Sequence, residues 1–242
     1  SGLPADTLAA RVGTELAPRY VVLSLRVERS ADEKDEGVDG TVASRRKVRR
    51  LEDALGDVGG RETLTLLSPN GGWVLVPSDE QEPPSAWVDP EPLVQALAAA
   101  AGVEVTAGVA WRPNLGGMAD AASEADQVLR LVIELDYPAG AYRVDDVLLD
   151  YVLTRPSAAR DRLDAVLVPL EDGPDLIATL EAYLASDFDR RGAAAALHVH
   201  PNTLDYRLRR VAELTGLDPS TTKGLQHLGA ALTVRRSRRT RP

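Results

Sequence analysis

The sequence predicts an α+β domain followed by an all-α domain, and three observations lead to that fold class. The chain has 242 residues, which is enough for two domains that each bury a core of their own. Before residue 145, β-branched strand-like runs alternate with helical patterns. Beyond it the strand signals end and helical periodicity remains, which is typical of a second, all-helical domain.

The first domain follows the order of a ferredoxin-like βαββαβ fold, an antiparallel sheet with helices on one face. We expect Ser44 to cap its first helix and the segment from Ser68 to Gly72 to form a hairpin turn. The expected strands are residues 20–27, 62–67, 73–76 and 103–111, and the expected helices are residues 44–55, 93–101 and 117–133. An acidic loop at residues 30–40 fits a solvated excursion better than a carboxylate cage for a metal.

Six helices are expected in the second domain, at residues 146–154, 157–168, 174–186, 190–198, 201–215 and 223–236. The chain then divides into a linker helix at residues 1–17, the α+β domain at 18–145, the helical domain at 146–236 and a basic tail at 237–242. The arginine-rich segment 235–241 has two open interpretations. It could follow DNA phosphates, or it could form a disordered terminus.

Charge is distributed unevenly along a chain whose net charge is −9. Residues 1–174 hold 17 basic and 30 acidic side chains, whereas residues 175–242 hold 11 basic and 7 acidic ones together with all three histidines. A basic segment beside an acidic one indicates a nucleic-acid or other acidic partner for the basic part.

The composition excludes several classes of protein. Cysteine is absent, which excludes disulfides, thiolate metal sites and thiol catalysis and favours a cytoplasmic location. No apolar run approaches the ~20 residues that span a bilayer, and the chain does not begin with a secretory pattern. P-loop, dinucleotide-binding, nucleophile-elbow and zinc-protease motifs are missing as well. We therefore expect no membrane partner and no cofactor.

Residues 190–216 show a helix-turn-helix pattern. Small residues from Ala193 to Ala196 let a first helix pack closely, Val199 closes the turn, and Pro201 begins the second helix. On that second helix one stripe at helical spacing is suited to packing, which leaves the opposite face for a partner. The stripe consists of Leu204, Leu208, Val211 and Thr215.

The face opposite the stripe holds the candidate site residues. The N-terminal half of a recognition helix meets base edges in the major groove, while further arginines suit phosphates. The candidates for base contact are Asn202, Thr203, Asp205, Tyr206 and Arg209, and those for phosphate contact are Arg207 and Arg210. A helical hairpin used only for packing or dimerisation is the alternative interpretation.

His198 and His200 alternate as metal ligands can. Two histidines without a cysteine nearby make a poor metal site, and both lie where turn and cap residues are expected. We therefore expect structural roles for them and no metal.

Residues 198–217, HVHPNTLDYRLRRVAELTGL, resemble the C-terminal helix-turn-helix of the PucR and CdaR families of bacterial transcriptional regulators. The likeness extends to residues 179–184 and 228–232, and the preceding domain resembles the degenerate GGDEF-like domain of those regulators. It implies an N-terminal sensory domain before Pro4. It also implies recognition-helix roles for Asn202, Thr203, Tyr206, Arg207 and Arg209.

The resemblance has two departures and one enzymatic alternative. Pro201 and Asp205 stand where many relatives carry arginine, so Asp205 could instead accept a hydrogen bond from cytosine N4. A diguanylate cyclase would need carboxylates to hold metal ions against triphosphate oxygens. Residues 71–75 read GGWVL, and the first strand offers Ser24 and Arg26, so we expect no enzyme activity.

Together these observations predict a sequence-specific DNA-binding transcriptional regulator. Its GGDEF-like domain is expected to be catalytically inactive and to serve regulation or dimerisation. The expected partners are double-stranded DNA, a second copy of the chain in a homodimer, and an unidentified small-molecule effector. The alternative is an effector-binding or protein-interaction module that has lost DNA binding.

Overall fold

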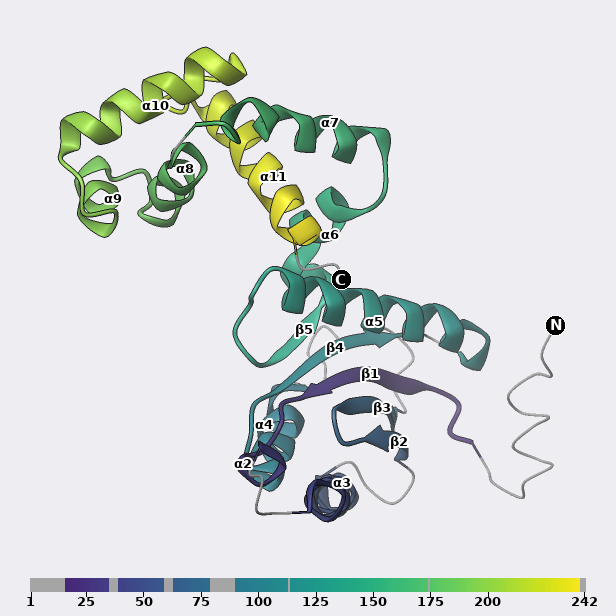
Figure 1. Cartoon of the computed structure of the whole chain (residues 1–242). Coiled ribbons are helices and arrows are strands. Elements are labelled where there is room, and N and C mark those ends of the chain that lie inside the picture. Colours follow the sequence, from purple (N-terminus) through teal and green to yellow (C-terminus); the bar gives the residue numbers. More distant parts are fainter. Residues whose placement is uncertain are drawn as a thin grey trace. The chain divides into compact units, whose positions relative to one another are not determined.

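The computed structural model describes residues 16–34, 39–58, 63–78, 90–112, 114–173 and 175–239. The chain divides into two compact units, residues 1–148 and 149–242, and each is described by itself (Figure 1). The linker helix expected at residues 1–17 lies almost wholly outside the described residues. Among the helices that are described, none has both the length and the apolar character needed to cross a bilayer.

The first unit is built on a five-stranded sheet in the order β2-β3-β1-β4-β5. β1 runs antiparallel to both β3 and β4, β2 runs antiparallel to β3, and β5 runs parallel to β4. The order of the first four strands confirms the predicted ferredoxin-like arrangement. β5 was not predicted because three residues are too few to show an alternating pattern. The strands are β1 Tyr20–Val27, β2 Leu64–Ser68, β3 Gly71–Pro77, β4 Val105–Trp111 and β5 Ala141–Arg143.

Helices cover both faces of this sheet, so the expectation of helices on one face is wrong. α3 (Gly40–Val58) and α4 (Pro90–Ala101) lie on one face and α5 (Met118–Glu134) on the other (Figure 1). β1 shows why, because Leu23 and Leu25 enter the core beneath α3 and α4 while Val22 enters the core beneath α5. A strand covered on both faces is expected to be a continuous apolar run, as β1 nearly is.

α3 begins at Gly40, four residues before the cap expected at Ser44. The carboxylate of Asp39 accepts a hydrogen bond from the Thr41 backbone N at 2.9 Å and thereby caps the helix. Ser44 lies inside the helix, and its hydroxyl donates to Glu33 Oε1 at 2.8 Å. The Ser44 side chain therefore hydrogen-bonds to another side chain and does not cap the helix.

The acidic loop after β1 contains the short helix α2 (Ala31–Lys34) and buries Glu33, which corrects the expectation of a fully solvated loop. Lys47 Nζ lies 2.5 Å from Glu33 Oε2 and also donates to the Glu28 carbonyl at 2.9 Å. Burial by itself would raise the pKa of Glu33, but hydrogen bonds from Lys47 and Ser30 outweigh it and lower that pKa from 4.5 to about 2. The buried ion pair ties α3 to the end of β1.

β2 and β3 form the predicted hairpin, but its turn contains only residues 69–70. Gly71 and Gly72 lie within β3 at φ values of 135° and 147°. A Cβ on Gly71 would lie 1.9 Å from the Leu25 carbonyl oxygen, and one on Gly72 would lie 2.1 Å from that of Leu66. The two glycines therefore allow β3 to approach both neighbouring strands closely, rather than forming the turn.

The second unit is all-α, and the structure confirms the six helices that the sequence predicts. α11 continues to Arg239, past residue 236, where we expected the helical domain to end. Ser237 is buried, and the Arg238 guanidinium lies 2.7 Å from Asp161 and 2.5 Å from Asp164. The described part of the expected tail is therefore helical and packs on α7. The helices are α6 Leu148–Thr154, α7 Ala158–Leu167, α8 Leu176–Ala185, α9 Arg190–Ala196, α10 Pro201–Thr215 and α11 Thr222–Arg239.

Removing one partner of the buried pair should destabilise the first unit. Lys47→Met leaves the Glu33 carboxylate buried without its cation, so we expect a loss of about 3–5 kcal/mol in the free energy of unfolding. All three tryptophans, Trp73, Trp87 and Trp111, belong to the first unit. Urea unfolding followed by tryptophan fluorescence therefore measures this unit alone.

Arg49→Met is the matched control, since Arg49 is exposed on the same helix. It should change stability by no more than about 0.5 kcal/mol. In the unsubstituted chain, the contribution of Glu33 is complete above its unfolded pKa of about 4.5 and is lost as the pH falls toward about 2. Equal effects of the two substitutions, or no acid dependence of this kind, would contradict a buried ion pair.

A second prediction concerns the contact between α5 and the sheet. A Cβ on Gly108 of β4 would lie 2.0 Å from the Ala125 carbonyl oxygen and 2.6 Å from the Leu129 backbone N, both in α5. Gly108→Ala must push the helix away, so we expect a loss of about 1–3 kcal/mol by the same fluorescence measurement. Gly56→Ala in α3 meets nothing within 4 Å, and it should stabilise the unit by about 0.5–1 kcal/mol.

Candidate nucleic-acid interface

α9 and α10 pack against each other as the two helices of a helix-turn-helix, joined by residues 197–200. Ala193 and Ala194 of α9 are buried against Leu204 and Leu208 of α10, and Val199 in the turn packs on the same cluster. Tyr183 of α8 completes it. The predicted close packing of small residues is confirmed for the first two alanines. The other two, Ala195 and Ala196, are exposed.

The ends of both helices are capped by side chains. The Asp189 carboxylate accepts hydrogen bonds from the backbone N of Arg191 at 3.0 Å and of Gly192 at 2.9 Å, which caps α9. His200 Nδ1 accepts one from the Asn202 backbone N at 3.2 Å and caps α10. His198 lies in the turn with a φ of 54°. The expected cap and turn roles of the two histidines are therefore confirmed.

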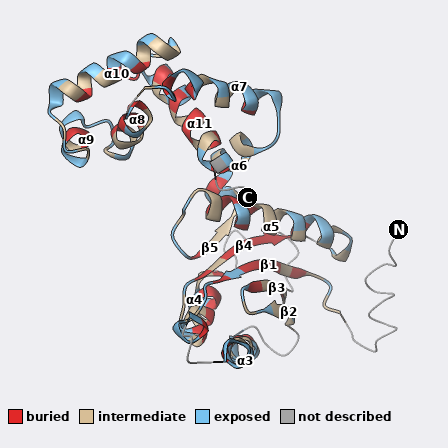
Figure 2. Ribbon diagram, in the orientation of Figure 1, coloured by how far each residue is buried: buried red, intermediate tan, exposed pale blue. Residues whose placement is uncertain are grey.

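α10 has one buried face and one exposed face (Figure 2). Within the predicted stripe, Leu204, Leu208 and Val211 are buried, and Thr215 at the helix end is half-buried. On the opposite face Tyr206 is 62% exposed, which is unusual for an aromatic residue that serves packing alone. Asn202, Arg209 and Arg210 are also exposed, whereas Thr203 and Asp205 are half-buried.

Arg207 lies on the side of α10 that faces α8. Its guanidinium is 2.8 Å from Asp175 and 3.5 Å from the Thr179 hydroxyl, and its side chain is 19% exposed. The contacts anchor the recognition helix to the start of α8. The phosphate contact expected of Arg207 stays a prediction.

Arg209 and Arg210 differ in their partners. Arg210 lies 2.8 Å from the Glu213 carboxylate one turn further along α10. Arg209 donates only a long hydrogen bond of 3.4 Å, from Nε to the Asp205 carbonyl. Among the described residues no carboxylate pairs with Arg209. Its positive charge is therefore the more available of the two for an external anion.

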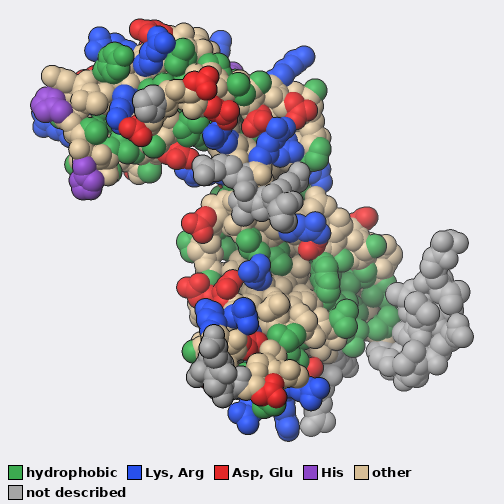
Figure 3. All heavy atoms as spheres, viewed as in Figure 1, with side chains coloured by type: hydrophobic (Ala, Val, Ile, Leu, Met, Phe, Trp, Pro, Cys, Tyr) green, Lys and Arg blue, Asp and Glu red, His purple; other side chains and the backbone are tan. Residues whose placement is uncertain are grey.

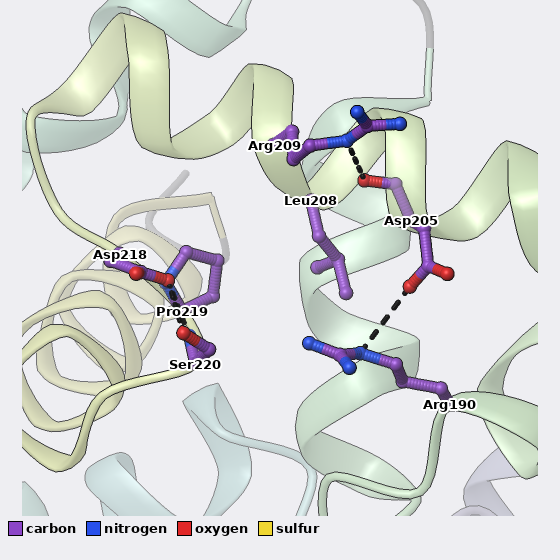
Figure 4. Close-up of a pocket in the computed structure, with 7 residues that line it drawn as sticks. All are labelled: Arg190, Asp205, Leu208, Arg209, Asp218, Pro219 and Ser220. Carbon is purple, nitrogen blue, oxygen red and sulfur yellow. Dashed lines mark hydrogen bonds and ion pairs between the residues drawn. The ribbon is translucent and has the colours of Figure 1, made fainter.

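Two surface hollows flank α10. One has a volume of about 380 Å³ and lies between α10, the start of α9 and the turn before α11 (Figure 4). The other, of about 440 Å³, lies between α10 and the segment before α8. The first is lined by Arg190, Asp205, Leu208, Arg209, Asp218, Pro219 and Ser220. The second is lined by Pro169, Asp172, Gly173, Leu176, Tyr206, Arg207, Arg210 and Leu214.

Sequence reasoning missed two of the groups beside α10. Arg190 begins α9 and pairs with Asp205 at 3.3 Å. In the turn before α11, Asp218 accepts hydrogen bonds from the Ser220 backbone N at 2.8 Å and from its hydroxyl at 2.7 Å. Helical spacing selects residues that share one helix, so the contacts made beside α10 by Arg190 of α9 and by the turn before α11 leave no signal in it.

The surface of the second unit is not uniformly basic. On the face that Figure 3 shows, basic and acidic side chains of this unit are intermixed. Ion pairs account for much of this, since Arg235 pairs with Glu171 and Arg236 with Glu181. The count of basic residues in the C-terminal part of the sequence is therefore larger than the number of positive side chains that lack a carboxylate partner and could bind an anionic ligand.

In the first unit, Trp73 and Val74 follow the two glycines of β3, and β1 carries Ser24 and Arg26. Val74 is fully buried, and Trp73 packs against the core beneath α5. On β1, the buried Ser24 lies opposite Trp73 and Arg26 lies opposite Gly71. Within the described residues no three His, Asp or Glu side chains come together as a metal site. None of the four side chains named on β1 and β3 is a carboxylate, the group that holds metal ions against triphosphate oxygens.

Each of the two parts of the chain matches a known protein family. Residues 176–234 match the family described as PucR C-terminal helix-turn-helix domain, and residues 2–131 match the GGDEF-like domain family. An uncharacterised protein of Mycobacterium bovis is 46% identical over 70 residues, which cover 28% of this chain. The match spans only 17% of that relative's length.

Two further relatives have descriptive names. The proline-responsive transcriptional activator PutR of Bacillus subtilis is 40% identical over 50 residues, 21% of this chain and 12% of PutR. A solved structure, the regulator of polyketide synthase expression from Bifidobacterium adolescentis, aligns over 97% of this chain and 86% of its own. Its identity is 21% and its TM-score is 0.39. The GGDEF-like match spans more than half of the sequence and shows that the chain belongs to the GGDEF-like domain family, and its C-terminal part matches the PucR C-terminal helix-turn-helix domain.

Proposed function

We propose that the chain is a transcriptional regulator that binds double-stranded DNA through α10. The observation that carries the proposal is the division of this helix into two faces. One face is packed against α8 and α9, and the other presents the exposed Tyr206 and an arginine without a carboxylate partner. A helix fits the major groove of B-DNA, where its exposed N-terminal half reaches base edges.

The exposed residues have the chemistry that base and phosphate contacts require. Asn202 can form two hydrogen bonds with adenine, and Arg209 can do the same with guanine. Thr203 and Tyr206 can contact either bases or phosphates, and Arg210 is placed for a phosphate. Arg207 acts mainly by holding α10 in place through Asp175. The name of PutR, a transcriptional activator with a similar segment, supports a role in transcription.

The proposal includes a homodimer. A single recognition helix contacts few base pairs, and two copies related by a two-fold axis would place their helices in successive major grooves, about 34 Å apart. A palindromic DNA site is then expected. The GGDEF-like unit would serve dimerisation or the response to a small-molecule effector, and a chain that binds DNA in this way would act in the bacterial cytoplasm.

Substitutions on the exposed face should weaken DNA binding without unfolding the protein. We expect Arg209→Ala and Tyr206→Ala each to raise the Kd by about 10- to 100-fold, because each would remove a contact in the groove. The probes are duplexes that the wild-type chain selects from a random pool. Fluorescence anisotropy at two salt concentrations gives the Kd and its salt dependence.

Arg162→Ala is the control, since it also removes one exposed arginine from the second unit, but on α7. It should leave the Kd nearly unchanged, and circular dichroism should show equal helix content for all variants. If the wild-type chain binds DNA and the α10 variants bind as tightly, the interface is elsewhere. If the wild-type chain binds no duplex at low salt, the interpretation as an interaction module without DNA binding gains support.

The GGDEF-like unit is proposed to be catalytically inactive, because Trp73, Val74 and Ser24 occupy the places where metal-binding carboxylates would be needed. Incubation of the 242-residue chain with GTP and Mg²⁺ should yield neither pyrophosphate nor a cyclic dinucleotide. An active diguanylate cyclase in the same assay is the positive control. Turnover that depends on protein concentration would overturn this part of the proposal.

A further inference from the structure

An ion pair joins the two helices of the helix-turn-helix on their exposed side. Arg190, the first residue of α9, places its Nε 3.3 Å from Oδ1 of Asp205 on α10. The two side chains are 52% and 47% exposed. At this exposure an ion pair contributes little to folding stability. Since the pair adds little stability, its position beside the recognition helix is better explained by a role in binding than by a role in folding.

The pair occupies only one edge of the Arg190 guanidinium. Nε faces Asp205, while the terminal nitrogens are directed away from it, toward the turn at residues 218–220 (Figure 4). Among the described residues these terminal nitrogens have no hydrogen-bond or ion-pair partner. Their four N–H donors remain available in the fork geometry that suits a phosphate.

The hollow beside Arg190 is lined by side chains of both charges. Arg209 reaches its rim from α10 with no carboxylate partner, and Asp218 lines its other side. The pKa of Asp218 is lowered, chiefly by hydrogen bonds from Ser220 and further by the charge of Arg190. The Asp218 carboxylate is already engaged in the turn, and it lies close enough to Arg190 to limit the net positive charge there.

Two backbone amides at the start of α9 are already engaged. The amides of residues 191 and 192 both donate to the Asp189 carboxylate, which caps the helix. Arg190 and Arg191 both lie at this end of α9, and Arg190 is the one that pairs with the recognition helix. An unpaired Asp205 on a helix that enters a DNA groove would repel the phosphates, and its pairing with Arg190 offsets that charge.

We propose that Asp205 is a positioning residue, which holds Arg190 so that its terminal guanidinium nitrogens contact a phosphodiester oxygen at the edge of the groove occupied by α10. This inference rests on the proposed DNA binding. It replaces the expectation that Asp205 reads cytosine. The two roles differ in a measurable way, since a positioning residue acts through Arg190 and a base-reading residue does not.

A double-mutant cycle separates the two roles. Asp205→Asn, Arg190→Gln and the double variant are compared by fluorescence anisotropy on duplexes selected by the wild-type chain. We expect Arg190→Gln to raise the Kd on the order of tenfold for all sequences alike and to reduce the salt slope by about 1. Asp205→Asn should weaken binding when Arg190 is present and have little effect in the Arg190→Gln background.

The sequence preference provides an independent readout. It should be the same for wild type and Asp205→Asn in a selection from a random pool. Arg162→Gln serves as the charge-matched control for Arg190→Gln, and helix content by circular dichroism verifies folding of every variant. Additive effects in the cycle, or a changed preference at one base pair with Asp205→Asn, would overturn the positioning role alone. Absence of binding by the wild-type chain would overturn the proposed function, and this inference with it.

Discussion

The burial of one stripe of α10 is the constraint on which the candidate interface depends. Leu204, Leu208 and Val211 can leave water only by facing α8, α9 and the core of the second unit, and this fixes the rotation of the helix about its axis. Successive side chains are rotated by about 100° around the helix axis. The orientation that buries the stripe therefore also turns Asn202, Tyr206 and Arg209 outward. The site is thus a consequence of core packing.

Ion pairs then determine which of the arginines on α9 and α10 retain a positive charge without a carboxylate partner. Arg207 is held by Asp175, Arg210 by Glu213 and Arg190 by Asp205. Arg209 has only a backbone carbonyl as partner. Net charge alone would treat these four side chains as equivalent, but a DNA phosphate must compete with a carboxylate at Arg207 and Arg210, whereas the terminal nitrogens of Arg190 remain available. The acidic residues around α10 therefore limit how much of its positive charge is available to a DNA phosphate.

The sequence was sufficient to predict the order of the first four strands of the first unit and the helices of the second, because long periodic segments with clear ends carry strong signals. It failed where tertiary contacts overrule local patterns. Ser44 is typical of a helix cap, but its hydroxyl donates a hydrogen bond to Glu33. Gly71 and Gly72 are typical of a turn, but they lie in β3 and permit close packing of the strands. The acidic loop resembles a solvated segment because nothing local to it reveals that Lys47, fourteen residues away, buries Glu33.

The same distinction applies to the candidate site. Periodicity identified the outward face of α10, and the structure agrees with it, since that face depends on a local repeat. The pairing of Asp205 with Arg190 depends on how α9 packs against α10, so no spacing within α10 could reveal it. This matters for function, because an aspartate on a recognition helix has opposite meanings in the two settings. Alone it selects a base through hydrogen bonding, whereas beside an arginine from the neighbouring helix it directs a cation toward the DNA backbone.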